Sequence, residues 1–152
     1  PMIIKSLEHL SLVSKQIADK VLKEDCIFLY GEIGTGKTTF SRYFINHLQK
    51  KGKIQETEVP SPTFNLLYEY EIKTSKIMHY DLYRLKTSEE TKQLGIFEDN
   101  KKTIKIIEWP ELLKDSVQDK LEINFKYTEN ENEREINFKG SGKWREFQIN
   151  EL

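Results

Sequence analysis

The stretch Gly31-Glu32-Ile33-Gly34-Thr35-Gly36-Lys37-Thr38 decides the fold of this chain, because it matches the phosphate-binding pattern G-x-x-x-x-G-K-[ST] without a mismatch. Its glycines let the backbone turn tightly, so that successive N–H groups can converge on phosphate oxygens. Lys37 can place its ammonium group against the β- and γ-phosphates, and the Thr38 hydroxyl can enter the coordination sphere of Mg²⁺. A helix that begins here adds the positive end of its dipole to the same anion site.

The segments on either side of this loop are those that a phosphate site requires. Cys26-Ile27-Phe28-Leu29-Tyr30 precedes the loop and is a short apolar run typical of a buried strand. After the loop, apolar residues recur at helical spacing through about Lys50. A turn that merely joined a strand to a helix would not need Lys-Thr at this offset. We therefore predict that the chain binds a nucleoside triphosphate, and that residues 31–38 and the adjoining Thr39 contact it.

Length and composition limit the remaining possibilities. The 152 residues indicate a single domain, residues 1–152, that is large enough to bury a core. A net charge of −1 gives no basic field for bulk nucleic-acid binding. Cys26 is the only cysteine, which excludes a disulfide framework and fits a reduced, cytoplasmic setting. No apolar run approaches the ~18 residues of a membrane span, and no signal peptide is recognisable, so we expect no membrane partner.

Two acidic residues stand where strands are predicted to end. Asp81 follows an aromatic and branched run, where it could hold a metal-bound water or simply form a turn. Glu108 ends an apolar strand that begins near Thr103, and an acid there would lie beside Thr38 to hold Mg²⁺ through water or to orient the attacking water. An aspartate is usual at this place. The predicted catalytic residues are Lys37, Asp81 and Glu108, and the predicted metal ligands are Thr38, Asp81 and Glu108.

The roles of several polar residues stay open. Two prolines make residues 58–64 an extended segment, from which Ser61 or Thr63 could deliver a hydroxyl towards the metal, although an ordinary turn fits as well. Arg84 could reach a phosphate or a partner, or form a surface salt bridge. We interpret His79 as a structural histidine and not as a base.

The rest of the chain predicts an α/β fold with a mixed central sheet, flanking helices and antiparallel hairpins. Alternating apolar residues near the C-terminus indicate a half-exposed hairpin that closes the sheet and carries no recognisable chemistry. The remaining expected elements are an edge strand at residues 2–5, a helix over 10–21 capped by Ser6, a hairpin of strands 64–71 and 76–80, and a helix from Thr87 to Gly95.

Four blocks taken together resemble one family. They are Gly31 to Thr38, Ser61-Pro62-Thr63-Phe64, His79 to Leu85, and Ile107 to Glu111. The sequence resembles the TsaE (YjeE-type) family, small P-loop ATPases of bacterial tRNA threonylcarbamoyladenosine (t6A) synthesis, from about Ser6 to Glu111. The last three blocks are far more specific than the phosphate loop, which many unrelated proteins share.

This resemblance implies a P-loop α/β fold, ATP with Mg²⁺, and slow hydrolysis that needs partner proteins. It implies that Asp81 and Glu108 serve the metal and the hydrolytic water, and that Trp109 lies near the nucleotide. The implied partners are the TsaD and TsaB proteins, of which TsaD transfers the threonylcarbamoyl group to A37 of tRNA. This chain would contact tRNA only indirectly, through that complex.

Other functions of a phosphate loop remain alternatives. A small-molecule kinase shares the loop and the size, but usually closes an arginine-bearing lid over the phosphate, and the four arginines here are widely scattered. A GTPase is disfavoured because the chain contains neither D-x-x-G nor N-K-x-D. In a third reading the chain is a binding module that does not hydrolyse ATP and in which the nucleotide only fixes a conformation for docking.

Overall fold

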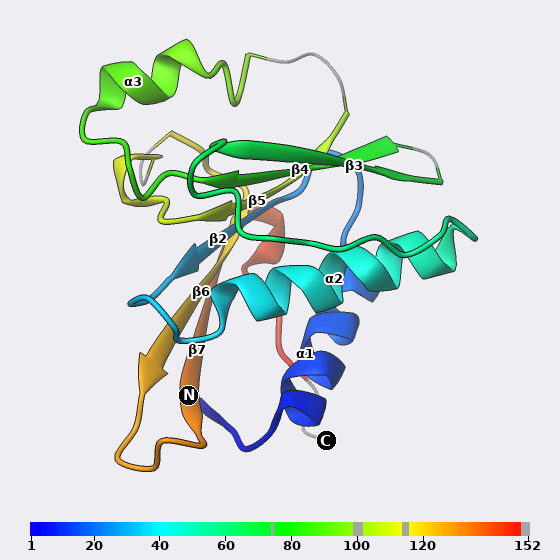
Figure 1. Cartoon of the computed structure of the whole chain (residues 1–152), viewed down its shortest axis with the longest axis vertical. Helices are drawn as coiled ribbons and strands as arrows, with labels where there is room; N and C mark the ends of the chain where they lie inside the picture. The colour runs from blue at the N-terminus through cyan, green and yellow to red at the C-terminus, as the bar shows by residue number, and fades with distance from the viewer. Residues whose placement is uncertain (74, 99–101, 114–115, 150–152) are drawn as a thin grey trace.

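In the computed structural model, which describes residues 1–73, 75–98, 102–113 and 116–149, the strands form one seven-stranded sheet in the order β1-β7-β6-β2-β5-β4-β3 (Figure 1). The α/β class predicted from the sequence is confirmed. The strands are β1 (Met2–Ile4), β2 (Cys26–Tyr30), β3 (Leu67–Ile72), β4 (Ser75–Asp81), β5 (Ile104–Glu108), β6 (Lys120–Tyr127) and β7 (Arg134–Ser141).

The middle of the sheet is parallel. Strand β2 pairs in parallel with both β5 and β6, and β4 pairs in parallel with β5, whereas the outer pairs β3–β4, β6–β7 and β1–β7 are antiparallel. The carboxyl ends of β2, β4 and β5 therefore meet at one edge of the sheet. In open α/β sheets this edge is where ligands bind.

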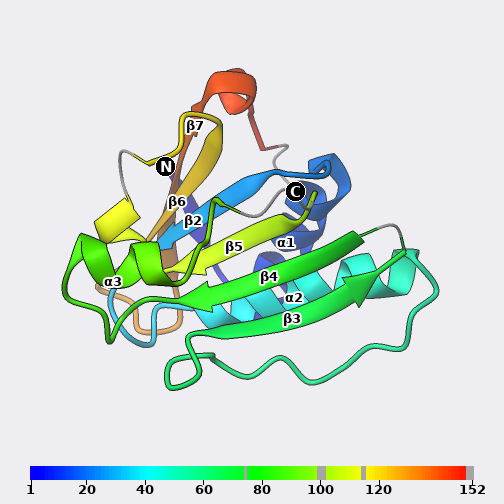
Figure 2. The ribbon, with the colours of Figure 1, turned by 90° about the horizontal axis from the view of Figure 1, so that it is seen from above.

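Two long helices cover one face of the sheet, α1 (Leu7–Lys20) and α2 (Lys37–Lys51) (Figure 2). Ser6 caps α1 by accepting a hydrogen bond from the His9 N–H. The rings of Phe40 and Phe44, 6.2 Å apart, carry α2 into the larger apolar core. A smaller core on the other face contains Phe28 and Ile107 and is covered by the chain around α3 (Ser88–Gln93). The 3₁₀ turns are η1 (Glu111–Leu113) and η2 (Gly142–Trp144).

The structure differs from the sequence expectation in two places. Phe64 lies in a turn and is 80% exposed, because β3 begins only at Leu67. The C-terminal hairpin does not form the edge of the sheet, since β1 pairs with β7 beyond it and β6 lies directly beside β2. Within the described part of the chain, no helix has the length and apolar character needed to cross a bilayer.

Candidate nucleotide-binding site

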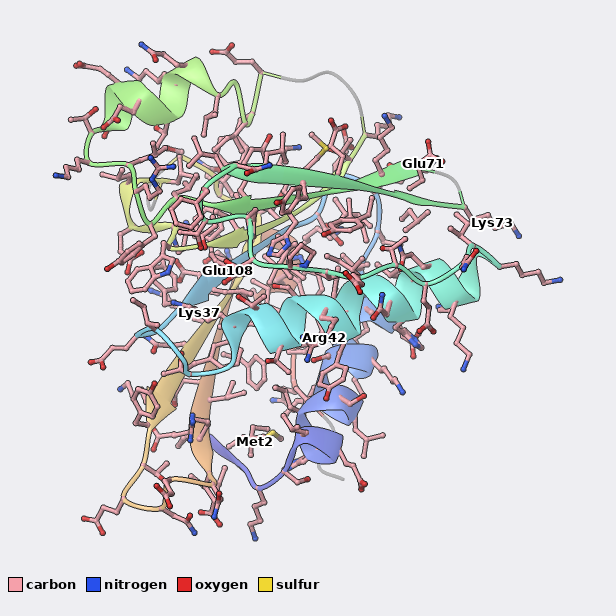
Figure 3. The ribbon with its side chains drawn as sticks, in the orientation of Figure 1. Met2, Lys37, Arg42, Glu71, Lys73 and Glu108 are labelled. Atoms are coloured by element: carbon pink, nitrogen blue, oxygen red, sulfur yellow. The ribbon has the colours of Figure 1, made fainter. Side chains whose placement is uncertain are left out.

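A cavity of about 200 Å³ lies at the carboxyl edge of the sheet, over the first turn of α2. Figure 3 shows Lys37 and Glu108 together at this end of the helix, whereas Glu71 and Lys73 lie at its opposite end. The cavity is lined by Ile33, Gly34, Gly36, Lys37, Thr38, Thr39, Ser61, Asp81, Glu108 and Trp109.

At two points, the loop before α2 approaches β6 so closely that a side chain would not fit. Gly31 has φ +145°, and a Cβ there would lie 2.7 Å from the Phe125 carbonyl oxygen. Gly34 has φ +82°, and its Cβ would lie 2.7 Å from the Tyr127 hydroxyl. That hydroxyl donates a hydrogen bond to the Ile33 carbonyl oxygen. Residues of β6 therefore pack directly against the backbone of the loop. A side chain at Gly31 or Gly34 would prevent this close contact.

Lys37 is folded back onto this loop. Its ammonium group donates to the Gly31 carbonyl oxygen and lies 3.6 Å from the centroid of the Trp109 ring. Burial lowers the pKa of Lys37, and the nearby carboxylates of Glu108 and Asp81 oppose that change. Trp109 has φ +57°, a left-handed conformation that is unusual for so large a residue, and its ring lies 4.7 Å from that of Tyr83.

The Glu108 carboxylate is buried, with 1% of the residue exposed, and is hydrogen-bonded on both oxygens. Its Oε1 accepts from the Thr38 hydroxyl at 2.9 Å, and its Oε2 lies 2.6 Å from His79 Nε2 and 3.4 Å from the Ser41 hydroxyl. The carboxylate thus joins the end of β5 to the first turns of α2.

Asp81 pairs with Glu108 in the register of β4 and β5. Whereas Glu108 contacts α2, Asp81 contacts the proline-containing segment. Its Oδ2 accepts from the hydroxyls of Ser61, at 3.2 Å, and Thr63, at 2.9 Å, while its Oδ1 accepts from the Tyr83 N–H. The proline-containing segment is therefore fixed to the end of β4. Arg84 donates to the Phe64 carbonyl oxygen at 3.0 Å, at the end of the same segment.

The structure divides the predicted residues between two adjoining hollows. Thr38, Thr39, Lys37, Asp81 and Glu108 share the first cavity, with Trp109 in its wall. Gly31, Glu32, Thr35 and again Trp109 line a second cavity of about 470 Å³ next to β6. Trp109 therefore lies beside both cavities.

Two residues that the sequence analysis does not assign to the site contact it in the structure. His79, which we interpret from the sequence as a structural histidine, is buried and contacts Glu108, and its two-residue spacing to Asp81 places both residues on one face of a strand. Tyr127 lies in the hairpin expected to carry no chemistry, but it contacts the loop at Ile33. No local sequence signal marks that contact, which joins residues far apart in the chain.

The candidate site does not lie in the larger of these cavities. A larger cavity of about 580 Å³ lies at the opposite end of the sheet, where apolar side chains and lysines line it, among them Leu22, Leu48 and Lys73. We place the candidate site in the smaller cavity because the phosphate loop, the helix start and the buried carboxylates converge there. The described residues contain no group of three or more His, Cys, Asp or Glu side chains that could hold a metal ion by themselves.

Comparison with known proteins identifies the family. The family model described as "Threonylcarbamoyl adenosine biosynthesis protein TsaE" matches residues 4–136. A tRNA threonylcarbamoyladenosine biosynthesis protein TsaE of Rickettsia felis is 38% identical over 74% of this chain and 64% of its own length. The protein of that name in Bacillus subtilis is 31% identical over 95% of this chain and 88% of its own length. The crystal structure of Bacillus subtilis YdiB superposes with a TM-score of 0.71 at 25% identity, covering 95% of this chain and 87% of that one.

Proposed function

The chain belongs to the TsaE family of threonylcarbamoyladenosine biosynthesis proteins, and from this premise we propose that it binds and hydrolyses ATP with Mg²⁺ in support of tRNA modification. The observation that carries the proposal is the 2.9 Å hydrogen bond between Thr38 and Glu108. It places the hydroxyl of the phosphate loop against the acid at the end of the neighbouring strand, which is the pairing that P-loop hydrolases use.

The side chains in the cavity fit a magnesium ion of this type. Mg²⁺ takes oxygen ligands and is usually held by one or two carboxylates together with phosphates and water, so a dedicated cage of protein ligands is not required. Thr38, Glu108 and Asp81 all supply oxygen atoms at the edge of one cavity. When bound, the ion would neutralise charge that develops on the β- and γ-phosphates.

The chain's own groups divide the work of hydrolysis between them. Lys37 moves from Trp109 and the Gly31 carbonyl to the phosphates, where its charge offsets that of the leaving group. The N–H groups of the loop and the start of α2 hold the phosphate oxygens in place. Glu108 would orient the attacking water or help to hold the metal, and Asp81 keeps Ser61 and Thr63 close to the same space.

The proposal extends to the partners. We infer that the chain acts with the TsaD and TsaB proteins and contacts tRNA through that complex, because its net charge of −1 provides no basic field of its own. We also propose that residues 1–152 act as one nucleotide-binding domain, supported by the single sheet that runs from β1 to β7. The cytoplasmic setting stays a prediction.

The test is a reconstitution with TsaD and TsaB from the same organism, ATP, Mg²⁺ and unmodified tRNA. We expect this chain to be required for t6A formation and its ATP hydrolysis to be stimulated in the complete mixture. The Lys37→Ala variant should support neither. ATP binding without stimulated hydrolysis would favour a binding module, and phosphate transfer to a small metabolite would favour a kinase; either result would refute the proposal.

A further inference from the structure

His79 makes the closest contact to the Glu108 carboxylate. Its Nε2 lies 2.6 Å from Glu108 Oε2, whereas the Thr38 hydroxyl lies 2.9 Å from Oε1 and the Ser41 hydroxyl 3.4 Å from Oε2. Without His79, Oε2 would keep only the long contact to Ser41. The position of that oxygen therefore depends mainly on the histidine.

The sheet register explains how His79 reaches the acid. On neighbouring parallel strands, His79 is opposite Ile106 and Asp81 is opposite Glu108, so the histidine lies one pleat deeper than the two acids and on the same face. It is fully buried beneath α2, with 0% of its surface exposed. His79 is not among the residues that line the cavity, so it contacts the carboxylate from within the core.

The hydrogen bonding of the ring indicates which nitrogen carries the proton. An ionised carboxylate only accepts hydrogen bonds, so the positioning role requires Nε2 to be the donor in this contact. Within the described part of the chain, Nδ1 is buried and has no hydrogen-bond partner. Burying an unpaired nitrogen is costly, and an apolar side chain of similar size would fill the same space without that cost. Packing alone does not account for a histidine here.

We propose that His79 is a positioning residue for Glu108, an inference that rests on the proposed hydrolytic function. Aspartate is usual at this place in P-loop sites, and glutamate adds one rotatable bond. His79 removes that freedom by fixing Oε2 towards the core. As a result Oε1 is directed to Thr38 and to the cavity, where the carboxylate is needed.

The first test compares two substitutions in the reconstituted mixture. His79→Leu removes the donor, and we expect turnover to fall about 10-fold or more, as for the loss of a hydrogen bond to a charged group, with ATP affinity changed less than about 3-fold. His79→Gln offers an amide N–H of similar reach and should recover most of the turnover. Unchanged turnover in a folded His79→Leu protein would overturn the inference. So would an equal loss of binding and turnover in both variants, because that result indicates a structural role.

A second readout does not depend on hydrolysis. In the ¹⁵N-labelled nucleotide-free protein, the imidazole of His79 should carry a slowly exchanging proton on Nε2, and Glu108→Ala should abolish its protection. The more accessible His9 and His47 provide the reference resonances in the same spectrum. A proton absent from Nε2 would overturn the positioning role even if hydrolysis is observed. If the wild-type protein does not hydrolyse ATP, the proposed function fails, while this spectrum still decides whether His79 holds Glu108.

Discussion

At the scale of single residues, Lys37 and Trp109 form the most informative contact of the site. The ammonium group lies 3.6 Å from the indole centroid and also donates to the Gly31 carbonyl oxygen. Both contacts involve the ammonium group, so under the proposed function a bound nucleotide would replace them with contacts to its phosphates. The indole ring is therefore placed to report on binding.

We predict a saturable change in tryptophan fluorescence when ATP is added. The change should disappear in Trp109→Phe, which leaves Trp144 as the remaining tryptophan. Trp144 is buried at η2, outside both hollows of the site, and should respond little. A full response that persists in Trp109→Phe would place the nucleotide elsewhere.

Lys37→Ala should weaken ATP binding about 100-fold, equivalent to about 3 kcal/mol for charge-assisted hydrogen bonds to phosphate. Isothermal titration with ATP and Mg²⁺ measures this directly. Lys51→Ala is the matched control, because that lysine is near the other end of α2 and contacts Asp19. An equal loss in both variants would indicate a general charge effect and not a specific site.

At the scale of elements, the phosphate loop depends on its neighbours β6 and α2. Tyr127 at the end of β6 donates to Ile33, and its hydroxyl closes the space that a side chain at Gly34 would need. The sequence allowed the strand, loop and helix at residues 26–51 to be predicted, because their signals are local. The position of β6 beside β2 could not be predicted, because strand order depends on pairing between distant segments.

Gly34→Ala should reduce ATP affinity by about 10-fold or more, because the new Cβ meets Tyr127 and the backbone stays at positive φ. Adding Tyr127→Ala should recover only part of that loss, since it removes the clash and not the backbone strain. Affinity measured by titration for the two single variants and the double variant separates these contributions. Full recovery in the double variant would show that φ is unimportant here.

Helix α3 provides a contrast, because its stability is local. Thr87 accepts from the Glu90 N–H while Glu90 accepts from the Thr87 N–H, a complete capping box that the sequence signal at Thr87 already indicated. We expect Thr87→Ala to lower the free energy of unfolding by about 1 kcal/mol in urea denaturation. ATP affinity should not change, and a large loss of affinity would mean that α3 contributes to the site.

At the scale of the whole molecule, three segments distant in sequence line one cavity because parallel strands end at a common edge. The loop after β2, Asp81 at the end of β4 and Glu108 at the end of β5 were each recognisable from the sequence. Their direct partners were not, because Ser61 and Thr63 could equally have formed a turn and the motif that begins at His79 does not tell which residue the histidine contacts. These contacts form between segments that are distant in the chain, and the pattern of a single sequence does not reveal them.

Cys26 allows the stability of the whole fold to be measured. Burial raises the pKa of its thiol to about 12, and the residue is 3% exposed within β2. At pH 8 we expect an aromatic disulfide reagent to label it only after the sheet opens, and immediately in guanidinium. ATP at about 100 times its Kd should slow labelling by up to about 100-fold if opening destroys the site. Rapid labelling of the native protein would contradict the packing described for β2.

The most direct test of the central claim compares ATP cleavage by the wild-type chain and by Glu108→Gln, each assembled with TsaD, TsaB and tRNA. The substitution keeps the size of the side chain and removes its charge. If Glu108 serves hydrolysis, ATP binding should stay within a few-fold of wild type while cleavage falls by about 100-fold or more. Cleavage at the wild-type rate would contradict the assignment of Glu108, and the hydrolytic site would have to be sought at Asp81.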